Sequence, residues 1–170
     1  EKETVINELA RETTRYLAML SRTSLPDDEH DSITDLISAV NDMERVGDHA
    51  MNILELAEFR EEHRLPFSNE AIQELVEISS KVQETFDLAI FAFLHWDKPA
   101  SRKIVENEEE IDSLENKLRT SHIKRLNEEL CDPSSGVIFL DLLTNLERVG
   151  DHSFNIASYV LNIDKNYKDL

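Results

Sequence analysis

Two pairs of acidic residues, each with its members four positions apart, lie in two nearly identical stretches of this chain. The stretch ERVGDHAMNI begins at Glu44 and returns 103 positions later as ERVGDHSFNI, with eight of ten residues identical. Residues four apart share one face of an α-helix, so Glu44 stacks on Asp48 and Glu147 on Asp151. Paired carboxylates repel each other unless a cation neutralises them. The spacing therefore predicts a cation site in each stretch.

A glycine separates the two acids of each pair. Gly47 and Gly150 are two of only three glycines in the chain, and glycine inside a helix costs about 1 kcal/mol relative to alanine. We therefore expect a neighbouring helix to approach closely at each glycine and to bring its own side chains onto the acids. Other acidic pairs with the same spacing, such as Glu58 and Glu62, lack this glycine and are interpreted as solvated helix faces.

The helix expected to face the second stretch carries a further pair, Glu108 and Asp112. Two facing pairs of carboxylates form an oxygen-rich pocket of the kind that holds hard cations. The corresponding residues of the first stretch are Glu3 and Asn7, and because an amide is a poorer ligand we expect that site to be weaker or differently built. The predicted metal ligands are Glu44, Asp48, Glu108, Asp112, Glu147 and Asp151.

A histidine directly follows the aspartate of each motif. His49 and His152 are predicted to orient neighbouring groups or to pack between helices rather than to bind metal, although ligation, a contact to a ligating carboxylate and pairing with acids across an interface all stay open. The other polar residues of the motif are predicted to form helix–helix hydrogen bonds (Asn52, Asn155) or salt bridges with nearby acids (Arg45, Arg148).

The elements that position these residues are predicted from proline placement and apolar spacing. Four prolines divide the chain into five segments, each with apolar residues three and four apart, which is the helical period. Helix-start signals accompany the breaks: Ser32, Ser68, Asp97, and Ser134 or Ser135. The prediction is an all-α antiparallel helix bundle with helices at roughly 1–24, 32–64, 68–96, 100–130 and 135–165.

Composition limits the classes of function. The 170 residues include 36 acids and 18 bases, for a net charge of −18, which disfavours nucleic acid as a partner. Cys131 is the only cysteine, so no disulfide framework or thiolate metal site is predicted, in keeping with a cytoplasmic setting. No apolar run approaches the roughly 20 residues of a membrane span.

An enzymatic function lacks support in the sequence. None of the six histidines has a glutamate three residues before it, as carboxylate di-iron oxidases require. There is no phosphate-binding glycine loop and no nucleophile elbow. We therefore predict that the protein is not an enzyme, and a purely structural bundle whose acids bind no metal stands as an alternative.

The motif Glu-Arg-Val-Gly-Asp-His-x-x-Asn-Ile, present twice about a hundred residues apart, resembles the PhoU family over essentially the whole chain. The resemblance implies a six-helix fold of two three-helix repeats, each binding a multinuclear metal cluster of iron or zinc. It implies Glu44 with Asp48, and Glu147 with Asp151, as ligands, with Glu108 and Asp112 as the partner pair. Asn7 departs from the pattern and puts the first cluster in doubt. The family regulates phosphate uptake and phosphate signalling from the cytoplasmic side.

Residues 122–127, Cys131 and residues 136–143 look more particularly like the PhoU domain at the C-terminus of bacterial Na+/phosphate cotransporters. The expected first repeat, residues 1–66, has two helices, and the second, residues 67–170, has three. The absence of an initial methionine and of a counterpart to the 68–96 helix predicts a further helix before Glu1.

The predicted function is a metal-binding regulatory domain that modulates phosphate uptake at the cytoplasmic face of the membrane. Its expected partner is the membrane portion of the transporter, upstream in the same chain. The alternative is a free-standing cytoplasmic regulator of the PhoU type that acts on phosphate-signalling proteins. A homodimer is a further alternative for the assembly.

Overall fold

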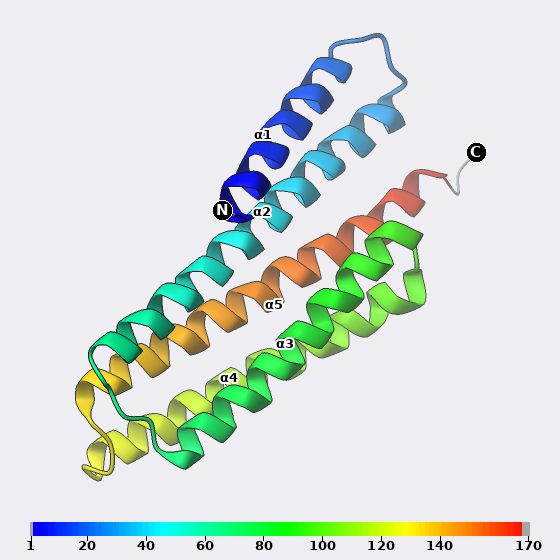
Figure 1. Cartoon of the computed structure of the whole chain (residues 1–170). Helices are drawn as coiled ribbons and strands as arrows, with labels where there is room; N and C mark the ends of the chain where they lie inside the picture. Colours follow the sequence, from blue (N-terminus) through cyan, green and yellow to red (C-terminus); the bar gives the residue numbers. More distant parts are fainter. Residues whose placement is uncertain (1, 168–170) are drawn as a thin grey trace.

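The computed structural model describes the backbone of residues 2–167 and the side chains of residues 2–161 except Asp28. Over that range the chain forms five helices and no strand (Figure 1). The helices are α1 (Lys2–Leu20), α2 (Asp27–Glu62), α3 (Asn69–His95), α4 (Lys98–Asn127) and α5 (Pro133–Tyr167). The predicted all-α antiparallel bundle is therefore confirmed.

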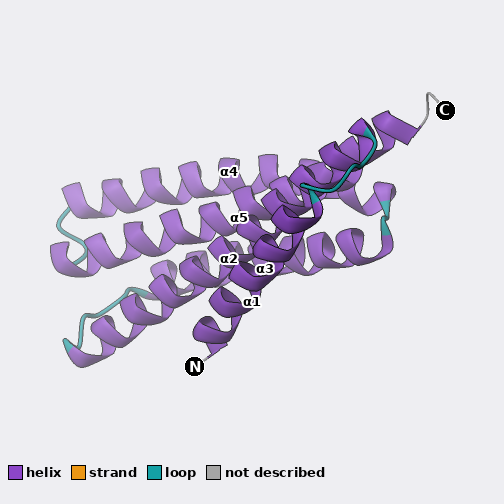
Figure 2. Ribbon diagram, turned by 90° about the horizontal axis from the view of Figure 1, so that it is seen from above, coloured by secondary structure: helices purple, strands orange, loops and turns teal. Residues whose placement is uncertain are grey.

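Helix α5 is the central element of the bundle. It contacts α2, α3 and α4, whereas α1 contacts only α2 among the described helices. Figures 1 and 2 show the result: α3, α4 and α5 lie together as one group, and α2 runs beside α5 with α1 on its outer side. The two helices that carry the repeated motif, α2 and α5, thus pack against each other.

Two of the predicted helix starts are confirmed in detail. The Ser68 hydroxyl accepts a hydrogen bond from the Ala71 amide at 3.2 Å at the start of α3. The Asp97 carboxylate accepts one from the Ala100 amide at 2.8 Å at the start of α4. Each side chain satisfies an amide that has no partner inside the first turn of its helix.

The other two predicted starts are wrong. Helix α2 begins at Asp27, directly after Pro26 and five residues before Ser32, because acidic residues at the first positions of a helix are stabilised by its dipole and remove the need for a serine cap. Helix α5 begins at Pro133, and the Asp132 carboxylate caps it by accepting from the Ser135 amide at 3.0 Å.

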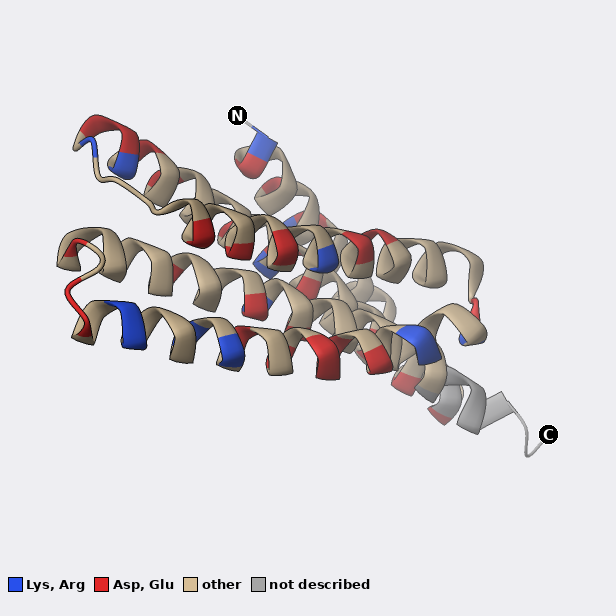
Figure 3. Ribbon diagram, turned by 90° about the horizontal axis from the view of Figure 1, so that it is seen from below, with Lys and Arg blue, Asp and Glu red and all other residues tan. Residues whose placement is uncertain are grey.

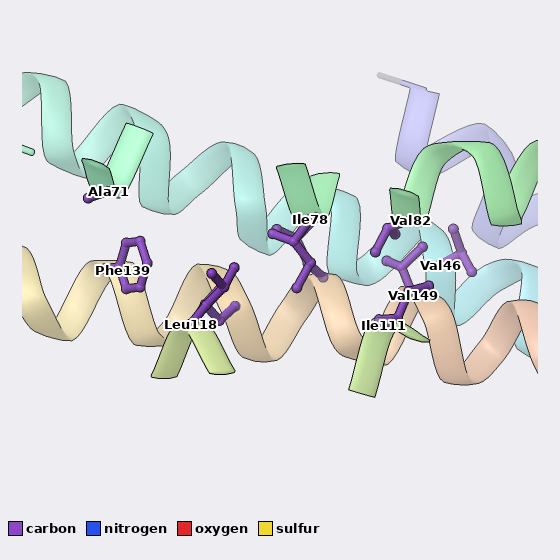
Figure 4. Packing of buried hydrophobic residues seen from close by; sticks show 10 residues of the cluster. Val46, Ala71, Ile78, Val82, Ile111, Leu118, Phe139 and Val149 are labelled. Carbon is purple, nitrogen blue, oxygen red and sulfur yellow. The ribbon is translucent and has the colours of Figure 1, made fainter. Parts of the chain in front are cut away.

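The main hydrophobic core lies between α3, α4 and α5 and extends to α2 (Figure 4). Ile78 of α3, Leu118 of α4 and Phe139 of α5 belong to this core, and all three side chains are almost fully buried. Burial of such side chains contributes roughly 1.5–3 kcal/mol each. This core holds α4 and α5 in a fixed register, on which the geometry of the acidic pairs depends.

Helix α1 has no third helix packed over it among the described residues. Six of its large apolar side chains are exposed: Val5, Ile6, Leu9, Tyr16, Met19 and Leu20. The prediction that a further helix precedes Glu1 concerns residues outside the structure and stays a prediction.

Acidic residues recur along the helices in Figure 3 and are not confined to one end. No helix within the described residues combines the length and the apolar character that a membrane span requires.

Candidate metal centre

A close contact between α4 and α5 positions the acidic residues of the second motif. A methyl group on Gly150 would lie only 3.2 Å from Cγ2 of Ile111, a fully buried side chain of α4. The close approach predicted at this glycine is therefore confirmed. On α4, Glu108 lies three residues before Ile111 and Asp112 one residue after it. On α5, Glu147 and Asp151 have the same positions relative to Gly150, so an acidic pair flanks the contact on each helix.

Three carboxylates meet beside this contact. One oxygen each of Glu108, Asp112 and Asp151 lies within 4.8 Å of the other two. Burial, together with repulsion from Asp112 and Asp151, raises the pKa of Glu108. Burial, with repulsion from Asp151, likewise raises the pKa of Asp112. The facing of the two helices predicted from sequence thus brings these three oxygens to one place.

Glu147 belongs to the same electrostatic group. Burial, and then the charge of Asp151, raises the pKa of Glu147. The guanidinium of Arg148 lies 2.9 Å from Asp151 and 3.5 Å from Glu147, which confirms the predicted salt bridge. This arginine therefore partly neutralises the two carboxylates of its own helix.

Glu115 is a further acidic residue at this site that sequence reasoning missed. Its carboxylate is buried and accepts hydrogen bonds from Arg119, one turn later on α4. It adds to the negative potential at Asp112 and Glu147. The signal was available, because Glu115 follows Asp112 by three residues and so lies on the same face of the helix.

The first motif has the same framework with looser packing. Ile6 of α1 meets Gly47 as Ile111 meets Gly150, but a methyl group on Gly47 would lie 3.5 Å away, an ordinary van der Waals contact. Asn7 donates a hydrogen bond to Glu3 at 3.3 Å within α1. The motif acids of α2, in turn, pair with Arg45, which lies 3.6 Å from Asp48.

The set of three acidic ligand atoms found at the second motif has no counterpart at the first, within the side chains that the structure describes. The one sign of a ligand position there is the Asn7 side-chain oxygen, which is buried and has no hydrogen-bond partner. The structure thus brings Glu108, Asp112 and Asp151 together with Glu147 near them, and it does not gather Glu44 and Asp48 into such a group.

The histidines of the motifs face the interface between α2 and α5. Nδ1 of His152 lies 2.7 Å from the Asp42 carboxylate of α2, and the Asn155 amide donates to the same oxygen at 3.1 Å. Equivalent contacts run from α2 to α5. Nδ1 of His49 lies 2.9 Å from the side-chain oxygen of Asn145, and the Asn52 amide donates to that oxygen at 3.1 Å.

These contacts confirm that the motif asparagines donate hydrogen bonds between helices, and they give the histidines an orienting role. The two imidazole rings also stack, with centroids 5.5 Å apart. Sequence reasoning missed the acceptors Asp42 and Asn145 because they lie outside the motif. Their separation of 103 residues matches the spacing of the repeat and was the signal that could have found them.

The donor atoms at the second motif suit a hard cation. All of them are carboxylate oxygens, which favour iron, manganese, magnesium or calcium over metals that prefer nitrogen or sulfur. Burial, and then the charge of neighbouring carboxylates, raises the pKa of Glu108, Asp112 and Glu147, and a bound cation would offset the cost of ionising them. The residues present therefore fit a metal, which Glu108, Asp112 and Asp151 would hold with Glu147 close by.

Fold and site together define a helix-bundle domain with an acidic, cation-compatible centre between two helices. The family model described as "PhoU domain" matches residues 1–57 and 75–160. The chain therefore belongs to the PhoU family.

Individual relatives agree with this assignment. A phosphate-specific transport system accessory protein PhoU homolog 1 of Thermotoga maritima is 29% identical over 140 residues, which are 81% of this chain. A PhoU homolog of the same description in Clostridium acetobutylicum is 21% identical over 161 residues, or 92% of this chain and 71% of that protein. The chain spans only 60% of the length of the Thermotoga relative.

A solved structure supports the fold. The crystal structure of PhoU from Pseudomonas aeruginosa superposes with a TM-score of 0.89 at 24% identity, and the match covers 96% of this chain and 78% of that one. The antiparallel arrangement of the helices is thus shared with a protein of the family.

Proposed function

We propose that this protein is a PhoU-type accessory regulator of phosphate transport whose second motif holds a metal centre. The observation that carries the proposal is the convergence of Glu108, Asp112 and Asp151 from two helices on one small volume. Membership of the PhoU family supplies the link to phosphate transport, since the relatives in Thermotoga and Clostridium are named as accessory proteins of a phosphate-specific transport system.

The names of these relatives support the accessory-protein alternative better than a domain of a sodium-dependent cotransporter. In that role the protein acts from the cytoplasm by contact with phosphate-transport or phosphate-signalling proteins, and it has no catalytic reaction of its own. The metal is a structural ion that holds α4 against α5. An all-carboxylate donor set favours iron over zinc, because zinc prefers histidine and cysteine ligands.

The test compares two matched variants. The protein is purified without chelator and analysed for bound metals beside Asp151→Asn and Asp48→Asn, which alter equivalent positions of the two motifs. We expect stoichiometric metal in the unaltered protein and in Asp48→Asn, and its loss in Asp151→Asn. Loss in both variants would contradict the assignment to the second motif, and absence of metal from all three would refute the metal centre.

The regulatory role has a separate test. In a bacterial host whose own PhoU protein has been deleted, uptake of radiolabelled phosphate is measured with and without this protein. Expression is expected to restore regulated uptake, and Asp151→Asn is expected to restore it less well. Unchanged uptake in both cases would count against a role in phosphate transport and leave the metal assignment untouched.

A further inference from the structure

The ring of Tyr159 fills a site between α5 and α2. Its hydroxyl donates to the Asp42 carboxylate at 2.9 Å, and Ser38 bonds the same phenol oxygen. Burial and the hydrogen bond to Asp42 raise the pKa of Tyr159 to about 12, so the phenol stays protonated as a donor. The interface between the two motif helices therefore accommodates a tyrosine side chain whose hydroxyl is held by two residues of α2.

The same site recurs 103 residues away in the chain, and there the ring is absent. Leu56 stands where the repeat places Tyr159, with Asp141 for Ser38 and Asn145 for Asp42. These residues line a cavity of about 410 Å³ between α2 and α5. The molecule thus holds a filled and an unfilled version of one pocket, and we call the unfilled one the Leu56 pocket.

The remaining walls of the Leu56 pocket suit a ring with a positive charge beside it. Ile138 gives an apolar wall, and the ring of Phe59, 46% exposed, stands at the edge and can stack on a bound ring. Glu55 and Asp141 supply two exposed carboxylates at the opening. The side-chain oxygen of Asn145 already contacts His49 and Asn52, and its NH2 group donates to the Asp141 backbone, so the pocket requires no hydroxyl from its ligand.

We propose that the Leu56 pocket binds an aromatic side chain, flanked by a basic residue, from a partner polypeptide. Free ligands of drug size are usually enclosed over most of their surface, whereas this opening is lined by four exposed residues: Asn52, Glu55, Phe59 and Asp141. An open pocket of this size suits a single anchoring ring whose backbone stays outside, as at protein interfaces. This inference goes beyond the proposed function and needs no metal.

The probe is the peptide N-acetyl-Arg-Tyr-Arg-amide, titrated into isotopically labelled full-length chain and followed by NMR. We expect the side-chain amides of Asn52 and Asn145 and the methyls of Leu56 to shift on binding. A peptide with alanine for the tyrosine should bind at least tenfold more weakly, and one with glutamates for the arginines likewise. Equal shifts with the alanine peptide would overturn the proposal.

The deciding variant is Leu56→Tyr, which places in the pocket the ring that the second repeat already uses. It should abolish peptide binding while its unfolding temperature stays at or above that of the unaltered protein. Asp141→Asn retains the cavity and should weaken binding severalfold, chiefly at low salt. Undiminished binding to Leu56→Tyr, or tyramine binding as tightly as the peptide, would refute a polypeptide anchor at this site. If Leu56→Tyr fails to fold, Asp141→Asn and the peptide series decide the matter.

Discussion

Substituting alanine for each of the two motif glycines should change stability in opposite directions. Either substitution gains about 1 kcal/mol of helix propensity. At Gly47 the new methyl group meets Ile6 at 3.5 and 3.6 Å, which are ordinary contacts, so Gly47→Ala should stabilise the protein by about that amount. With 2–4 °C per kcal/mol for chains of roughly this size, its unfolding temperature should rise by about 2–4 °C.

At Gly150 the methyl group would meet Ile111 at 3.2 and 3.3 Å, tighter than packed cores normally allow. Overpacking of this kind costs about 1–3 kcal/mol. Subtracting the gain in propensity leaves Gly150→Ala about 0–2 kcal/mol less stable than the unaltered protein. It should also weaken metal binding, because α4 must move away from α5.

Urea unfolding in the presence of chelator measures both variants without a contribution from metal. Ile111→Val serves as the relief control, since it removes the Cδ1 atom that lies 3.3 Å from the added methyl group. The double variant Gly150→Ala/Ile111→Val should lose less stability than the two single changes add up to. If Gly150→Ala were as stabilising as Gly47→Ala, the tight contact would not be what requires glycine, and the reasoning would fail.

Two further predictions concern buried polar groups. Burial lowers the pKa of His122 below its ordinary 6.5. As the pH falls below 6.5, this histidine therefore takes up a proton more readily in the unfolded chain than in the folded one. Its contribution to the free energy of unfolding is lost as the pH falls. In urea unfolding, the free energy of unfolding should therefore fall less for His122→Leu than for the unaltered protein when the pH is lowered from 7.5 to 5.5. Equal decreases in the two proteins would contradict this. Asp42→Ala removes the acceptor of the Tyr159 hydroxyl, and a double-mutant cycle with Tyr159→Phe should give a coupling of about 1 kcal/mol; a coupling near zero would count against the bond.

Sequence was sufficient for the helices and for the second acidic centre because both follow from local rules. Proline positions and apolar spacing determine where helices can run, and the four-residue spacing of Glu147 and Asp151 determines which face they share. The facing pair on α4 was also accessible, since the repeat indicates which helix must approach the glycine. Local rules failed at the start of α2, where acids next to Pro26 outweigh the serine cap expected at Ser32.

Local rules of helix formation do not predict the contacts between α2 and α5. Asp42 and Asn145 share the 103-residue spacing of the repeat, but they become acceptors only once the two motif helices pack side by side. Tyr159 bonds to Asp42 across the interface in the second copy, whereas Leu56 lines an open pocket with Asp141 and Asn145 at the corresponding place in the first. Such consequences depend on relative placement of elements far apart in the chain, which periodicity does not specify.

The repeated motif has two faces with separate contacts, and this explains how the copies can be so alike and yet differ in the carboxylates that gather beside them. In the second copy Asp151 lies beside Glu108 and Asp112 of α4, whereas α1 offers Asn7 at the corresponding position of the first copy. The histidine and asparagine of the motif point toward the other motif helix and make the same hydrogen bonds in both copies. Eight shared residues in ten therefore do not require two metal centres, because the interface alone accounts for part of the identity.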